Sequence, residues 1–159
     1  MSDEHFATEV TLKCVSMAAD RLKKFRREPK GFAVLYNAEG EFHNVGLRML
    51  SELLRDDGWE TELHVSGSLL SVLRGVTEGK RVDLLCLSAT MPSSVPRVAE
   101  AVRVIRNEQA LKSSKVLVGG PAFEDVVAKE VLGLVDCVAS SFSEALAFSR
   151  SVRSQSGAV

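Results

Sequence analysis

The feature that most constrains the fold is a regular alternation of short apolar runs with segments of helical periodicity. Between the runs, apolar residues recur every three or four positions, as on one face of a helix. A last helix is predicted from Ser141, with Glu144 at capping-box spacing three residues later. The predicted strands are 32–36, 59–64, 82–87, 115–118 and 135–138, and the predicted helices between them are 47–54, 69–76, 95–105 and 126–131.

This alternation predicts an α/β fold with a doubly wound, five-stranded parallel sheet. The runs 32–36, 82–87 and 115–118 are apolar throughout, which is typical of strands covered by helices on both faces. Right-handed crossovers then favour the flavodoxin-like (Rossmann-like) strand order 2-1-3-4-5. In such a sheet a ligand binds at the carboxyl ends of the strands, near the point where the first and third strands lie side by side.

An additional amphipathic helix is expected before the first strand. Its apolar face would comprise Phe6, Val10, Cys14, Met17 and Phe25. The basic cluster that follows is interpreted as a solvated helix end, and contact with nucleic acid is the minority interpretation. The predicted organisation is therefore a helix in 1–29, an α/β domain in 30–150 and a flexible tail in 151–159.

Length and charge limit the function further. The chain has 159 residues, which suits one α/β domain, and its formal net charge is -1. A balanced charge offers no strong field for nucleic acid or anionic membranes. The chain has no apolar run near the roughly 18 residues of a membrane span, and its acidic N-terminus is unlike a signal peptide. We expect a cytoplasmic protein whose widely spaced Cys14, Cys86 and Cys137 are reduced core residues.

The loops after the first, third and fourth strands carry the residues that could form a site. Several ligand classes can be excluded there. A phosphoacceptor domain needs Asp where Ser88 stands, and the carboxylates of Glu39 and Glu41 disfavour a phosphate after the first strand. The dinucleotide motif G-x-G-x-x-G is absent, because only Gly40 and Gly46 are present in that loop.

What remains is Glu41-x-His43-x-x-Gly46, then Ser88-x-Thr90, then Gly119-Gly120, in order on three successive loops. This combination resembles the vitamin B12 (cobalamin)-binding domain family over about residues 30 to 150. The resemblance implies base-off/His-on binding, in which His43 is the lower axial ligand to cobalt and replaces the cofactor's own dimethylbenzimidazole. An uncharged imidazole suits a transition metal, and Glu41 is placed to hold its other nitrogen.

The resemblance also implies where the displaced nucleotide tail lies. It would enter a slot between the first and third strands, where Ser88 would hydrogen-bond the benzimidazole and the paired glycines would leave space. Whether the cofactor is adenosyl-, methyl- or hydroxocobalamin stays open. Trp59, the only tryptophan, is interpreted as a packing residue in preference to a corrin contact. The residues implied to contact cobalamin are Glu41, Phe42, His43, Asn44, Val45, Gly46, Ser88, Thr90, Met91, Gly119 and Gly120.

Three hypotheses for function follow. Most members of the family have Asp where Glu41 stands, and the resemblance associates the Glu form with B12-dependent light-sensing regulators. The first hypothesis is therefore a stand-alone cobalamin-binding protein with a regulatory or photosensory role, acting through a transcription factor or a second copy of itself. The second is a corrinoid-carrying subunit that serves the catalytic subunit of a methyltransferase or mutase. The third is a relic domain that no longer binds the cofactor.

Catalysis by the chain itself is not expected. The candidate loops provide no acid, base or nucleophile arranged for chemistry on a substrate. We therefore expect a binding module, without direct contact with nucleic acid or membrane, whose output depends on a protein partner or a homodimer.

Overall fold

Five parallel strands form a single sheet in a computed structural model of the chain, which describes residues 10, 11, 13, 14, 17, 31–77, 80–123 and 131–156. The strand order is β2-β1-β3-β4-β5, and every neighbouring pair is parallel. The predicted flavodoxin-like order is therefore confirmed. The strands are β1 (Phe32–Asn37), β2 (Glu60–His64), β3 (Leu84–Ser88), β4 (Lys115–Gly119) and β5 (Cys137–Ala139).

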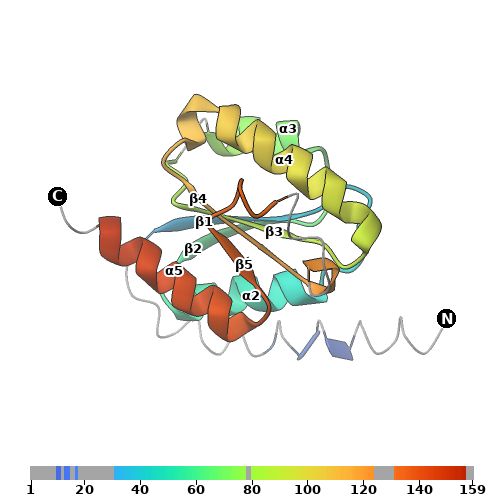
Figure 1. The fold of residues 1–159 in the computed structure, drawn as a ribbon. Coiled ribbons are helices and arrows are strands. Elements are labelled where there is room, and N and C mark those ends of the chain that lie inside the picture. Colours follow the sequence, from blue (N-terminus) through green and yellow to red (C-terminus); the bar gives the residue numbers. More distant parts are fainter. Residues whose placement is uncertain are drawn as a thin grey trace.

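Helices cover both faces of this sheet (Figure 1). The helices α3 (Leu69–Thr77) and α4 (Val95–Asn107) lie on one face, and α2 (Val45–Asp56) and α5 (Phe142–Ser156) lie on the other. This arrangement follows from right-handed crossovers that change direction at β1. None of these helices, within the part of the chain described, has the length and apolar composition needed to cross a membrane.

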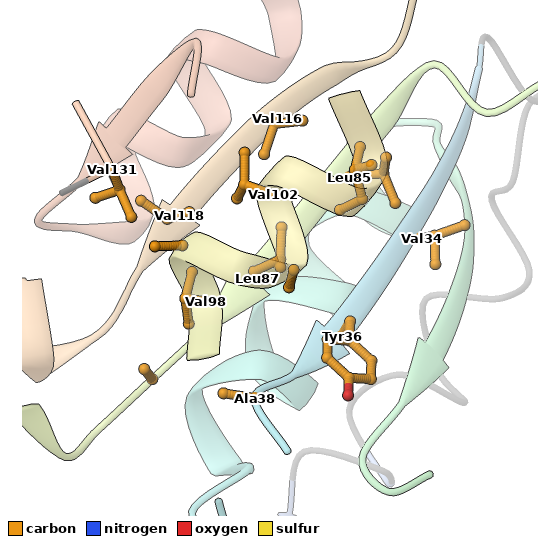
Figure 2. Close-up of a cluster of buried hydrophobic side chains, with 14 of the residues drawn as sticks. Val34, Tyr36, Ala38, Leu85, Leu87, Val98, Val102, Val116, Val118 and Val131 are labelled. Carbon is orange, nitrogen blue, oxygen red and sulfur yellow. The ribbon is translucent and has the colours of Figure 1, made fainter. Parts of the chain in front are cut away.

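The two faces of the sheet carry separate hydrophobic clusters. Val34 and Leu85 point toward α4, where they pack with Val98 and Val102 (Figure 2). Their chain neighbour Leu35 points the opposite way, toward α2 and α5. Successive residues of a strand face opposite sides, so both sides of β1, β3 and β4 must be apolar. Fully burying such a side chain stabilises the fold by about 1.5–3 kcal/mol.

Several boundaries differ from the sequence prediction; the strand predicted over 82–87, for example, is Leu84–Ser88. The predicted tail boundary at residue 150 falls inside α5, which continues to Ser156 because Val152 packs into the cluster on the α2 side. The strand predicted over 135–138 begins at Cys137, because residues 131–134 form a turn that is closed by the Val135 N–H bond to the Val131 carbonyl. The helix predicted over 126–131 falls mostly on residues outside the described ones.

Cys14 is not a core residue, contrary to prediction. It is exposed, whereas Cys86 is buried and Cys137 is partly buried, and all three thiols are free. The two described clusters are built from residues between 32 and 152, and α2 to α5 already cover both faces of the sheet. The rest of the predicted helix in 6–25 lies outside the described residues, apart from positions 10, 11, 13 and 17. Trp59 is 3% exposed, as a packing residue should be.

Candidate functional site

The three predicted loops meet at one edge of the sheet. Ser88, the last residue of β3, is the register partner of both Asn37 on β1 and Gly119 on β4. Gly119 in turn pairs with Ala139 on β5. Parallel strands that end in register place their following loops side by side. The His43 loop, the Ser88–Thr90 segment and the paired glycines are therefore neighbours.

A cavity of about 750 Å³ opens at this edge, within the usual range of ligand sites. It extends between α2, α5 and the sheet. All the predicted cofactor contacts line it except Glu41 and Met91. Residues that the motif did not indicate also line it: Leu47, Leu50, Cys86, Leu87, Leu117, Pro121, Ala139, Ser140, Ser141, Phe142 and Ala145.

The cavity does not follow the predicted slot between β1 and β3. No described residue of β1 lines it, and its sheet wall is built from β3, β4 and β5. The physical reason is side-chain size: Leu35 of β1 fills its side of the sheet and is fully buried, whereas Gly119, Ala139 and Ala145 leave space. The small residues on β4, β5 and α5 could have indicated this cavity in the sequence, but such residues are also common in ordinary cores.

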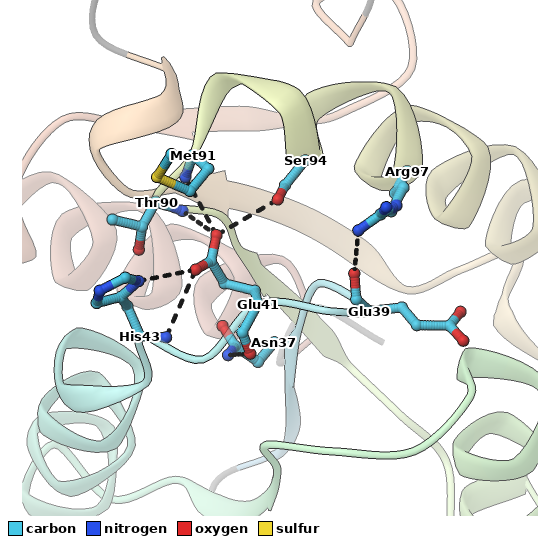
Figure 3. A network of polar contacts seen from close by, with 8 residues as sticks. All are labelled: Asn37, Glu39, Glu41, His43, Thr90, Met91, Ser94 and Arg97. Atoms are coloured by element: carbon cyan, nitrogen blue, oxygen red, sulfur yellow. Dashed lines mark hydrogen bonds and ion pairs between the residues drawn. The ribbon is translucent and has the colours of Figure 1, made fainter.

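His43 stands at the mouth of the cavity with its side chain 69% exposed. Its Nδ1 lies 3.0 Å from Oε1 of Glu41 (Figure 3). No hydrogen bond from a described residue reaches the other ring nitrogen, Nε2. An imidazole held at one nitrogen and open at the other is the usual arrangement of a metal-ligating histidine.

Glu41 is buried behind His43 and does not touch the cavity. Its second carboxylate oxygen, Oε2, accepts hydrogen bonds from the backbone N–H groups of Thr90 (2.9 Å) and Met91 (3.1 Å) and from the Ser94 hydroxyl (3.4 Å) (Figure 3). Burial alone would raise the pKa of Glu41, but the hydrogen bonds from Thr90, His43 and Met91 lower this pKa to about 2. The carboxylate is therefore ionised at neutral pH and can hold the Nδ1 proton of His43.

Met91 contributes to this network through its backbone only. Its side chain is 50% exposed and does not line the cavity, which differs from its predicted contact with the cofactor. The turn that it occupies points the side chain toward solvent while directing the N–H inward to Glu41.

The single imidazole of His43 fits a metal that is already coordinated by a cofactor. No group of three or more His, Cys, Asp or Glu residues is placed to hold a metal ion in the part of the chain that is described. A single imidazole from His43 cannot hold a bare ion firmly, but it can complete the coordination of a metal already bound in a macrocycle. Beside it, a Cβ built on Gly46 would meet nothing within 4 Å, so the cavity has open space next to α2.

Comparisons with known proteins agree with this geometry. The chain is 29% identical over 119 residues to dimethylamine corrinoid protein 1 of Methanosarcina acetivorans, covering 74% of this chain and 54% of that protein. The structure of the monomethylamine corrinoid protein from Methanosarcina barkeri matches with a TM-score of 0.70 and 25% identity, over 84% of this chain and 63% of the other. The chain thus spans about half the length of the first of these relatives.

A third similarity concerns the fold alone. A cobalamin-binding protein from Desulfitobacterium hafniense matches with a TM-score of 0.67 and 20% identity, over 92% of this chain and 68% of the other.

The family model of the B12 binding domain matches residues 31–147, which is most of the chain. With the His43 site and its cavity inside that range, the chain belongs to the B12-binding domain family, and its cofactor is a cobalamin or related corrinoid.

Proposed function

We propose that this chain carries a corrinoid for a methyl-transfer system and presents it to a separate catalytic protein. The observation that carries the proposal is the Glu41-held imidazole of His43 at the mouth of an open cavity. The chain that contains it is similar to proteins named for the corrinoid of dimethylamine and monomethylamine systems. A bound corrinoid supplies a cobalt centre that can accept and release a methyl group.

The residues have distinct roles in this proposal. His43 provides the lower axial ligand through Nε2, and Glu41 fixes the tautomer by accepting the proton of Nδ1. The cavity between α2, α5 and the sheet receives the displaced nucleotide tail, with the hydroxyls of Ser88 and Thr90 as polar partners at its rim. Gly46 and Gly119 keep the wall free of side chains there.

The chain is a carrier in this proposal, and catalysis belongs to the partner. His43 and Cys86 are the ionisable side chains in the described lining of the cavity. Burial raises the pKa of the Cys86 thiol to about 12, so that this thiol stays protonated and is a poor nucleophile. The described lining of the cavity therefore offers no ionised side chain to pair with His43.

The relatives favour the carrier hypothesis over the photosensory one. The photosensory hypothesis rested on Glu41 in place of Asp, whereas the two relatives named for methylamines are corrinoid proteins by name, and neither name refers to light sensing or transcription. Glu41 reaches His43 at 3.0 Å, so the longer side chain is compatible with ligation and needs no sensory role to explain it.

Loading with cofactor tests the proposal. Purified chain mixed with hydroxocobalamin in the dark and then desalted should stay coloured and give a base-off/His-on spectrum, and His43→Ala should lose that spectrum. Colourless wild-type protein would refute cofactor binding. The methylcobalamin-loaded chain should keep the same oligomeric state in light and darkness; a light-driven change would favour the photosensory hypothesis instead.

A further inference from the structure

The side chains that line the cavity change from polar at its mouth to apolar at its floor. The hydroxyl and amide side chains in the described lining belong to residues that are partly or fully exposed: Asn44, Ser88, Thr90, Ser140 and Ser141. The buried residues that the cavity shares with the hydrophobic cluster on the α2 side are apolar, apart from one thiol: Leu47, Leu50, Cys86, Leu117, Ala139 and Ala145. A ligand that fills the cavity therefore has a polar end and an apolar end.

The register of the strands explains this division. Ser88 and Gly119 are register partners at the edge of the sheet, and Cys86 and Leu117 are partners two residues earlier. Residues two apart on a strand point to the same face and lie about 6–7 Å from each other. Cys86 and Leu117 therefore form a floor below the mouth, and this pair is called here the cavity floor.

The cavity floor offers a polar ligand group no strong partner. The backbone of β4 is paired with β3 on one side and with β5 on the other, so its N–H and C=O groups are engaged in the plane of the sheet. Among the buried residues of the described lining, only Cys86 has a side chain that can form hydrogen bonds. A thiol is a weak donor and a weak acceptor, and burial raises the pKa of this one to about 12, so it stays uncharged.

We propose that this cavity selects corrinoids whose nucleotide tail ends in an apolar, benzenoid base such as dimethylbenzimidazole, and that the cavity floor carries this selectivity. The inference rests on the proposed function, because it requires the displaced tail to occupy the cavity. The ribose and phosphate of the tail stay joined to the corrin at the mouth. The six-membered ring of the base lies furthest from that link, so it reaches the cavity floor.

Adenine is the base that tests this selectivity. It has the bicyclic shape of dimethylbenzimidazole and a ring nitrogen able to bind cobalt, but its six-membered ring carries an amino group and further nitrogens in place of methyl groups. Against the cavity floor these polar groups lose water without gaining a strong partner, which weakens binding by roughly tenfold or more. The methyl groups of dimethylbenzimidazole, in contrast, gain from leaving water.

Equilibrium dialysis of the full chain in the dark compares three methylated corrinoids. They are methylcobalamin, its analogue with adenine as the base, and methylcobinamide, which has no nucleotide tail. Each dissociation constant is corrected for the fraction of free cofactor whose base is off cobalt, which a pH titration of its visible spectrum gives. After this correction, methylcobalamin should bind the wild type about tenfold or more tightly than the adenine analogue. Equal corrected affinities would overturn the selectivity.

Cys86→Ser tests the cavity floor itself. The substitution supplies a hydroxyl that donates and accepts, at nearly unchanged volume, so the preference for methylcobalamin over the adenine analogue should narrow by about threefold or more. Cys137→Ser is the matched control, because Cys137 packs against the same cluster but does not line the cavity. It should keep the wild-type preference. If Cys86→Ser does not fold, Ala145→Ser takes its place, since it adds a hydroxyl to the α5 wall of the same cavity.

The outcomes separate this inference from the proposed function. A wild-type chain that binds none of the three corrinoids would refute the proposed function. A chain that binds methylcobinamide as tightly as methylcobalamin would still carry a corrinoid, but its tail would lie outside the cavity, and the selectivity alone would be overturned. A preference that is the same in Cys86→Ser, or in its replacement Ala145→Ser, as in the wild type would overturn the role of the cavity floor.

Discussion

The His43 loop owes its geometry to a buried charge. Glu41 is 6% exposed, and burying its carboxylate is costly unless several donors compensate the charge; His43, Thr90, Met91 and Ser94 provide these donors. These donors come from two separate parts of the chain. A single side chain thus contacts both His43 and the turn between β3 and α4.

The low pKa of Glu41 predicts how acid affects stability. Its ordinary value is 4.5, and the folded protein lowers it to about 2. The unfolded chain therefore takes up the proton first as the pH falls, so that the stabilisation is complete above pH 4.5 and is lost between pH 4.5 and 2. Thermal unfolding of wild type and Glu41→Gln should give a Tm difference that is constant from neutral pH down to about pH 5 and shrinks below.

Glu39→Gln is the control for that comparison, because it removes an exposed charge from the same loop. Groups that lie far from Glu41 titrate alike in all three proteins and cancel in the difference. A Tm gap between wild type and Glu41→Gln that stays constant down to pH 3 would contradict the low pKa.

Two glycines of the site should respond oppositely to alanine. A Cβ on Gly46 meets nothing within 4 Å in helix α2, whereas a Cβ on Gly120 would lie 2.4 Å from the Ala89 carbonyl at a φ of +110°. In cofactor-free protein, Gly46→Ala should raise the free energy of unfolding by about 0.5–1 kcal/mol, because it removes the flexibility of glycine in a helix. Gly120→Ala should lower it by about 1 kcal/mol or more. Urea denaturation measures both, and equal losses would contradict the prediction.

At the scale of elements, the start of α5 closes one end of the cavity. Ser141 caps the helix by accepting the N–H of Glu144 (3.2 Å), and the Glu144 carboxylate accepts from the backbone N–H and the hydroxyl of Ser140 (2.8 and 2.9 Å). The helix start that the sequence predicts at Ser141 is thus confirmed, although the reciprocal bond goes to Ser140.

Removing the cap should weaken the helix measurably. Ser141→Ala leaves the N–H of Glu144 without its partner and should lower the free energy of unfolding by about 1 kcal/mol. Ser143→Ala, an exposed serine in the same turn, is the control and should change little. Urea denaturation of cofactor-free protein checks the difference, and equal effects of the two substitutions would contradict the capping role.

A group of hydrogen bonds from Arg106 holds the edge strand β5 in place. Arg106 at the end of α4 donates to the carbonyls of Leu134 (2.9 Å) and Ser114 (3.1 Å) and to Oδ2 of Asp136 (2.6 Å). Asp136 also accepts the N–H of Val116 on β4 (2.8 Å). One guanidinium thus fixes the segment before β5, which carries Ala139 to the cavity.

Lysine cannot replace that guanidinium. Its single ammonium lacks the planar fork that reaches three acceptors, so Arg106→Lys should lower the free energy of unfolding by about 1–2 kcal/mol. Arg103→Lys, one turn earlier and paired among the described residues with the exposed Glu100 alone, should change it little. The prediction fails if chemical denaturation gives the same small loss for both.

The same elements explain what the sequence could and could not predict. Strands β1, β3 and β4 were predictable because both of their faces are apolar, and the loop motif located His43, Ser88 and Gly119. The start of β5 was misplaced because Val135 is apolar but belongs to a turn. The residues on either side of it are held by Arg106 and Val116, which are distant in sequence, and periodicity does not report such contacts.

The course of the cavity was missed for a related reason. Ala139 and Ala145 form its wall by being small, and an alanine in the sequence looks the same whether it borders a cavity or fills a core. The bridge from Glu41 to Thr90 and Met91 was equally hidden, because it uses backbone N–H groups that any residue provides.

At the scale of the whole molecule, the cavity joins parts of the chain from Phe42 to Ala145. A ligand that fills it contacts α2, three strands and α5 together, and binding only to the folded state stabilises the entire domain by mass action. At a free concentration of 100 times Kd, this stabilisation is about 2.7 kcal/mol. The size of the effect should depend on whether the ligand has a part that enters the cavity.

Cobinamide, a corrinoid without the nucleotide tail, makes that test. Cobalamin should raise the Tm of the wild-type chain more than an equal concentration of cobinamide, because only its tail can fill the space between α2 and α5. Gly46→Leu places a side chain in that open space and should remove the difference while leaving the cobinamide shift in place. Gly133→Leu is the control. A Cβ at Gly133 is also unobstructed, but this residue lies on an exposed turn away from the cavity, so the variant should keep the difference between cobalamin and cobinamide. Equal Tm shifts from the two corrinoids in the wild type would mean that the tail binds elsewhere.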